Sequence, residues 1–436
     1  MRADKFRQLI LEEKVYKSRR KKRKKKSEKN SLAGFDEAGT VKAYYTKFIK
    51  ELNHKGFINE KYVYRIIEVP HKFSLKKDYD GSMLFFRKLV SSYFLSSGSV
   101  TIDFRKCEYS SIANFSLLEV MLINLQSIKE RYNSFKYIEC SKQIKILQSE
   151  ADTKTNKYLH AFLGVKLPDS QDDGSRYMKL PLQSGKQRNY KENPKARVSS
   201  AVVDFVNKST ERVGVELNMR GRRAIEHLMG EVLGNAEDHS VPYGDWFVDG
   251  ISFAEKQENT EVVDVNLTIM NVGPSMYEGF EQTKIENAVN YSKCQKLYEL
   301  HKSQFTHFNK FERESLFTLY LLNDGISRLK YKDESRGNGT MRFLESFITL
   351  GGFGEKNPKF KSELNVISGH TILTCDNNMH AFKDNDLNTL SLNKEKDFKK
   401  LPDRNYLVYN AEFFPGTILE CHIYLNEDYF KEKIKS

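Results

Sequence analysis

The segment Arg223-Ala-Ile-Glu-His-Leu-Met-Gly-Glu-Val-Leu-Gly-Asn-Ala-Glu-Asp-His-Ser240 decides how this chain is interpreted. Its apolar residues recur at the spacing of one helix face: Ile225, Leu228, Met229, Val232, Leu233 and Ala236. Glu231, Asn235 and His239 follow at intervals of four, and each interval turns a helix by only about 40°. They therefore form one polar stripe beside the apolar face. We predict a ligand site along this stripe; the alternative is a helix whose polar groups are satisfied by neighbouring side chains.

The spacing Glu231-x-x-x-Asn235-Ala-x-x-His239-Ser240 resembles the N box of the GHKL ATPases. That family comprises gyrase, heat-shock chaperone, histidine kinase and mismatch-repair proteins. Its Asn oxygen binds the Mg²⁺ that bridges the nucleotide phosphates, and its Glu is the general base. The resemblance implies these roles for Asn235 and Glu231, and nucleotide binding for His239. The chemistry suits the residues, because Mg²⁺ prefers oxygen ligands and phosphoryl transfer requires a positioned base.

A second motif follows the alternating apolar residues Val263, Val265, Leu267 and Ile269, which predict a half-buried strand. The strand leads into Asn271-Val-Gly273-Pro-Ser275-Met276, which resembles the G1 box, commonly Asp-x-Gly-x-Gly, that reads adenine. The resemblance implies nucleotide binding by Asn271, Gly273 and Met276. Asn271 replaces the usual Asp, and Ser275 replaces the usual second Gly. Asn271 keeps a side-chain oxygen but loses the charge, which puts nucleotide affinity or base preference in doubt.

A third motif is the glycine-rich segment Ser335-Arg-Gly-Asn-Gly-Thr-Met341, which precedes a helix-like run. Glycines before a helix allow backbone amides to approach phosphate. The segment resembles the G2 box of the same family, and the resemblance implies nucleotide binding by Arg336, Gly337, Asn338, Gly339 and Thr340. Arg336 could equally be a solvated charge.

The last motif, Pro415-Gly-Thr417, opens an alternating strand and is similar to the closing strand of the GHKL sheet. It implies that Thr417 lies near the base of the nucleotide. The motifs occur in family order, and the insertion 277–334 is where the ATP lid is expected, with a helix over Phe305 to Asn323. We also expect a hairpin over Ile367 to Cys375. The resemblance covers residues 195–436.

The N-terminal half alternates predicted strands and helices, which favours a helix-covered parallel or mixed sheet. Strands are expected over Tyr62–Val69, 100–104 and Tyr137–Cys140. Helices are expected over Thr40–Leu52, Ser82–Leu95 and Asn114–Tyr132. The strand at 100–104, with Ser110, Ser111 and the following helix, weakly resembles the STAS fold of anti-sigma-factor antagonists over residues 60–165. That resemblance implies Ser111 as a possible phosphoacceptor, although Tyr109 stands where Asp is usual. An unrelated α/β scaffold is the equal alternative.

Length and composition limit the number of domains, the class of partner and the cellular location that we expect. With 436 residues the chain exceeds one ordinary core, so two domains are expected. Residues 1–30 hold 14 Lys or Arg and 4 Asp or Glu, so they carry most of the net charge of +13. The run at residues 17–26 is a basic arm for nucleic acid or only a solvated tail. Five scattered cysteines predict reduced thiols and a cytoplasmic location. The longest apolar stretch is too short for a membrane span.

The sequence thus predicts a two-domain α/β protein. A basic arm (1–30), a STAS-like α/β domain (35–165) and a polar linker (166–194) precede a GHKL α/β sandwich (195–436), whose mixed sheet has helices on one face. The predicted ligands are ATP and Mg²⁺; a regulatory protein partner and a homodimer are further possibilities. We expect a regulatory or signalling ATPase in which Glu231 is the base and lid closure switches a partner. A serine/threonine kinase of the anti-sigma type and an ATP-gated binding switch without hydrolysis remain alternatives.

Overall fold

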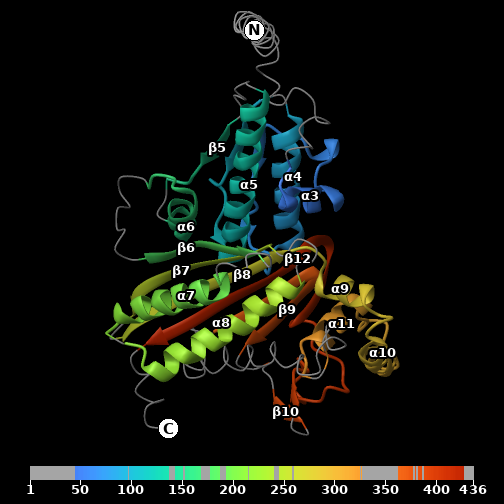
Figure 1. Ribbon diagram of the computed structural model, residues 1–436. Coiled ribbons are helices and arrows are strands. Elements are labelled where there is room, and N and C mark those ends of the chain that lie inside the picture. The colour runs from blue at the N-terminus through green and yellow to red at the C-terminus, as the bar shows by residue number, and fades with distance from the viewer. Residues whose placement is uncertain are drawn as a thin grey trace, which may run out of the picture. The chain divides into compact units, whose positions relative to one another are not determined.

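The chain divides into two compact units that alternate along the sequence (Figure 1). The first contains the described residues within 1–73, 84–109 and 117–166, and the second those within 74–83, 110–116 and 167–436. The computed structural model describes residues 45–96, 98–136, 143–150, 153–167, 177–186, 193–214, 216–239, 245–257, 260–324, 326, 362–376, 379, 382–384 and 387–426. No helix among these residues has the length and apolarity to cross a membrane.

The first unit contains a parallel three-stranded sheet. Its strands are β1 (Ile66–Glu68), β3 (Val100–Asp103) and β5 (Ile144–Leu147), in the order β1-β3-β5. The helices are α3 (Lys47–His54), the short 3₁₀ helix η2 (Glu60–Tyr62) and α6 (Lys154–Leu163), together with most of α4 (Tyr79–Leu95) and α5 (Ile112–Lys136). A short ladder joins β2 (Lys72–Phe73) to β4 (Tyr109–Ser110).

Local sequence explains why α6 begins and ends where it does. The Thr153 side chain accepts the Asn156 N–H at 3.1 Å, which caps the start of the helix. At the other end Gly164 adopts a φ of 65°, the left-handed conformation that glycine takes without steric cost. The two caps satisfy backbone groups that a short helix would otherwise leave unpaired.

The second unit is built on a five-stranded sheet in the order β6-β7-β8-β12-β9. The strands are β6 (Tyr177–Lys186), β7 (Asp245–Gln257), β8 (Thr260–Val272), β9 (Glu363–Asp376) and β12 (Leu407–Asn426). A smaller hairpin joins β10 (Phe382–Asp384) to β11 (Leu387–Thr389). All four pairings in the large sheet are antiparallel, so the prediction of a mixed sheet is wrong for the described part.

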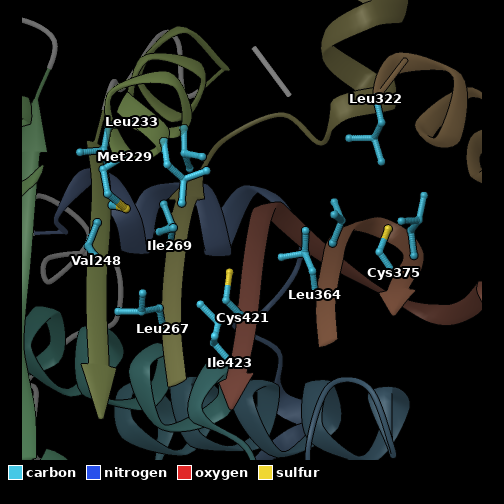
Figure 2. Close-up of a cluster of buried hydrophobic side chains, with 14 of the residues drawn as sticks. Met229, Leu233, Val248, Leu267, Ile269, Leu322, Leu364, Cys375, Cys421 and Ile423 are labelled. Carbon is cyan, nitrogen blue, oxygen red and sulfur yellow. The ribbon is translucent and has the colours of Figure 1, made fainter. Parts of the chain in front are cut away.

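Helices α7 (Pro194–Glu211) and α8 (Met219–His239) lie side by side against this sheet (Figure 1). Figure 2 shows Met229 and Leu233 of α8 facing the sheet, near Val248 and Ile269. All four side chains belong to one buried core cluster. Burying each such side chain contributes roughly 1.5–3 kcal/mol, which holds α8 in a fixed position on the sheet.

Three helices follow β8 in the chain: α9 (Met276–Gln282), α10 (Ala288–Lys302) and α11 (Arg313–Leu321). The predicted helix over Phe305 to Asn323 is therefore shorter than expected. Its first part is irregular, and α11 begins only after Glu312. The core of these helices is aromatic, with Phe280, Tyr291 and Phe317 in mutual ring contact.

Several other predicted boundaries need correction. Within the predicted linker 166–194, Tyr177–Lys186 forms β6, an edge strand of the large sheet. Its polar composition reflects its edge position. The predicted hairpin over Ile367 to Cys375 is instead one strand, β9, in which Gly369 at φ 61° lies at a register shift against β12. The predicted strand Tyr62–Val69 shortens to β1, and Tyr137–Cys140 lies outside the described residues.

Candidate functional site

A pocket in the second unit lies at the C-terminal part of α8. Its walls come from α8, β8, β9 and β12 and from residues that begin α9 and follow α11. Four of the predicted nucleotide-binding residues line it, and they come from three separate motifs: Asn235, Asn271, Met276 and Thr417. The other lining residues are all apolar: Val232, Ala236, Ile269, Met270, Leu322, Val366 and Leu419.

Of the polar stripe predicted on helix α8, Asn235 lines this pocket, whereas Glu231 does not. Asn235 lines the pocket and is half-buried, one helical turn after the half-buried Glu231. Val232 and Ala236 on the same helix also line the pocket, so this part of α8 forms one wall. His239 is the last residue of α8, and its side chain lies outside the described part of the chain.

Asn271 is fixed by two hydrogen bonds within the protein. Its Nδ2 donates to the carbonyl oxygen of Ala236 at 3.2 Å, and its Oδ1 accepts the backbone N–H of Thr417 at 3.0 Å. A carbonyl partner requires the amino group and an N–H partner requires the oxygen, so these contacts set the orientation of the carboxamide. Asn271 is only 2% exposed and ties α8 to β12 across the end of β8.

Ser368 joins the remaining motif residues and was not predicted. Its Oγ accepts the Met276 N–H at 2.9 Å, and it lies 2.9 Å from the Thr417 Oγ1 and 3.1 Å from the Gly416 carbonyl oxygen. A buried serine in a strand gives no sequence signal by itself. Its role depends on β9 lying beside β12 with Ser368 opposite Thr417.

Close approach of two backbones explains the glycine before Thr417. Gly416 has a φ of 138°, and a Cβ built there would lie 2.1 Å from the carbonyl oxygen of Asn271. Gly273, also predicted to bind nucleotide, has a φ of 151° and donates its N–H to the Pro415 carbonyl oxygen at 3.3 Å. It does not line the pocket, so the structure gives it a turn position beside the site.

The pocket is narrow. Its cavity volume is about 60 Å³, which is room for a few water molecules. A purine ring would need more space than the pocket has in this conformation. Met276, at the start of α9, and Leu322, just after α11, are among its walls.

Besides Glu231 and Gly273, two further groups of predicted residues are not part of this pocket. Arg336, Gly337, Asn338, Gly339 and Thr340 lie outside the described residues. Ser111 directly precedes α5 and is only 2% exposed, with its Oγ 3.2 Å from the Asn114 Oδ1. A kinase needs an accessible hydroxyl, so this conformation does not present Ser111 as a phosphoacceptor.

Comparison of the chain with protein-family models, with curated proteins and with solved structures finds no significant match. Within the described residues, no group of three or more His, Cys, Asp or Glu side chains could hold a metal ion by itself.

Proposed function

We propose that the second unit binds ATP with Mg²⁺ in the pocket beside α8 and that the protein is a regulatory ATPase of the GHKL type. One observation carries the proposal: Asn235, Asn271, Met276 and Thr417 line the same pocket although they are separated by up to 182 positions in the sequence. The sequence resemblance assigns all four to nucleotide binding. An unrelated helix–strand arrangement gives no reason for them to meet.

The donor set is compatible with the proposed ligands. Asn235 offers a carboxamide oxygen, the type of ligand that Mg²⁺ prefers, and nucleotide phosphates would supply further oxygens. Glu231 lies one turn away and is the proposed acceptor of the proton from an attacking water. The apolar walls of the pocket, among them Ile269 and Leu419, suit a flat purine ring.

A second candidate is a switch that binds ATP without hydrolysing it. Glu231 favours this alternative, because it does not line the pocket and the described lining holds no carboxylate. Asn271 already has partners inside the protein for both polar atoms of its side chain, which limits its contact with a base. Phosphate transfer to a protein is the third possibility, and Ser111 is not a suitable acceptor in this conformation.

The test is Mg²⁺-ATP turnover by the full chain, wild type against Glu231→Ala. Glu226→Ala is the matched control, because Glu226 lies on the same helix but is exposed. We expect Glu231→Ala to lower turnover by about 100-fold or more while the ATP dissociation constant changes less than about twofold. Equal turnover in both variants would remove Glu231 from the mechanism. ATP binding without wild-type turnover would select the binding switch.

A further inference from the structure

The first unit has an open sheet edge that is independent of the nucleotide pocket. In the order β1-β3-β5, strand β5 is an outer strand, paired only with β3 among the described residues. The Val100 N–H donates to the Gln143 carbonyl oxygen at 2.9 Å, and the Phe104 N–H donates to the Leu147 carbonyl oxygen at 2.8 Å. In a parallel ladder with these bonds, the backbone groups of Ile144 and Ile146 point away from β3.

A groove runs beside this edge. Its cavity volume is about 700 Å³, within the range of ligand and peptide sites. Apolar residues from α4, α5, β5 and α6 line it: Tyr93, Leu122, Ile123, Ile144, Ile146, Phe162 and Leu163. Ile123 is 51% exposed on α5, and Ile144 and Ile146 are only half-buried. The apolar face of the sheet therefore continues to its edge without being fully covered.

The side chains and the backbone of β5 both favour the same kind of occupant, an added strand. Ile144 and Ile146 direct their N–H and C=O groups to the edge, where no strand among the described residues pairs with them, and their side chains line the groove. An added strand would pair with these backbone groups and place every second one of its own side chains over the groove. A helix would bury apolar surface in the groove but leave the edge groups unpaired, which costs free energy.

The charged residues at the rim of the groove further limit which kind of segment could bind there. Glu119 and Glu130 lie on α5 at the groove, against one basic lining residue, Lys129. Carboxylates in excess at a rim favour an occupant with basic flanks. Natural edge strands are protected by a short length, by charged side chains, by proline, by a bulge or by a covering segment. The described part of β5, Ile-Lys-Ile-Leu, is short but contains neither proline nor a bulge, and its one charged side chain, Lys145, lies on the sheet face opposite to that of the two isoleucines.

We propose that this groove is a docking site for an extended peptide segment of a partner protein, which adds to the sheet as a strand beside β5. The segment carries branched apolar side chains at alternate positions and Lys or Arg at its ends. Backbone hydrogen bonds to Ile144 and Ile146 supply affinity, and the apolar groove selects the side chains.

The probe is a fluorescein-labelled peptide, Lys-Thr-Val-Thr-Ile-Thr-Val-Lys, titrated into the full chain by anisotropy. The test variant is Ile123→Glu, which adds a charge to the groove. Ile285→Glu is the matched control, because Ile285 is also exposed, at 80%, but neither lines the groove nor lies on β5. We expect saturable binding that Ile123→Glu weakens by tenfold or more and that Ile285→Glu changes less than twofold.

A second measurement identifies the mode of binding. The peptide should slow hydrogen exchange at the amides of Ile144 and Ile146. A scrambled peptide of the same composition, without the alternation, should neither bind nor protect them. The proposal is overturned if the alternating peptide fails to bind, if both variants bind it equally, or if binding leaves these two amides unprotected.

Discussion

The Asn271 side chain accepts the backbone N–H of Thr417 at 3.0 Å, directly across the β8–β12 pair in which these two residues are opposite each other. The same carboxamide donates to the Ala236 carbonyl oxygen on α8 at 3.2 Å. One buried side chain thus joins three elements that line the pocket. A carboxylate at this position could not donate to Ala236.

Asn271→Asp should therefore destabilise the protein rather than improve its site. The new carboxylate would lie against the carbonyl oxygen of Ala236, with no proton to donate and little water nearby. We expect the free energy of unfolding to fall by about 1–3 kcal/mol, measured by urea denaturation. An unchanged denaturation midpoint would show that the bond to Ala236 does not stabilise the fold.

Gly416 should not tolerate any side chain. Its φ of 138° and the 2.1 Å approach to the Asn271 carbonyl oxygen predict that Gly416→Ala costs at least about 2 kcal/mol. Gly230→Ala is the control: Gly230 is exposed within α8, and no atom lies near its added Cβ. That substitution should stabilise by about 0.5–1 kcal/mol. Equal effects of the two changes on thermal unfolding would contradict the close approach.

The ion pair of Glu420 and His422 predicts a pH dependence of stability. Burial alone would lower the pKa of His422, but the charge of Glu420, whose Oε1 lies 3.9 Å from the His422 Nε2, outweighs it and raises this pKa above 6.5. Burial alone would raise the pKa of Glu420, but His422 and the Ala113 N–H lower it below 4.5. A raised histidine pKa stabilises fully below pH 6.5, and this contribution is lost as pH rises through the folded-state value.

His422→Gln tests this dependence. In the wild type the thermal midpoint should fall as pH rises above 6.5, and the variant should lose that part of the slope. The contribution of Glu420 has the opposite sign: it is present above pH 4.5 and is lost as pH falls through its depressed folded-state pKa. Identical pH profiles for the wild type and the variant between pH 6.5 and 9 would refute the role of His422.

The narrow pocket makes a prediction about Leu322, which is 1% exposed and lines it. Leu322→Ala should lower stability by about 2–5 kcal/mol and strengthen adenosine binding, because the smaller side chain leaves the ring more room. Leu316→Ala is the control, since Leu316 is fully buried on α11 but lies outside the pocket. It should lose similar stability without a gain in affinity, which equilibrium dialysis with adenosine would detect.

The sequence predicts a helix or strand well where a single hydrophobic period determines that element. The 3.6-residue period of α8 and the alternation in β8 predicted both elements and the facing of Asn235. Which strands pair with one another across long stretches of sequence cannot be predicted from such local patterns. Ser368 became part of the site only because β9 lies beside β12, and β6 was hidden by the polar composition of an edge strand. Segments 74–83 and 110–116 belong to the second unit through contacts that no local pattern records, such as the Ala113 N–H to Glu420.

The most direct test is calorimetric titration of ATP, with and without Mg²⁺, into the wild type and Asn235→Ala. The proposed site predicts that the wild type binds ATP with Mg²⁺, and that removing either Mg²⁺ or the Asn235 carboxamide weakens binding by tenfold or more. Once one of the two is absent, removing the other should have little further effect, because the amide acts through the metal. ATP affinity that is the same in both proteins, or no ATP binding by the wild type, would contradict the assignment of this pocket.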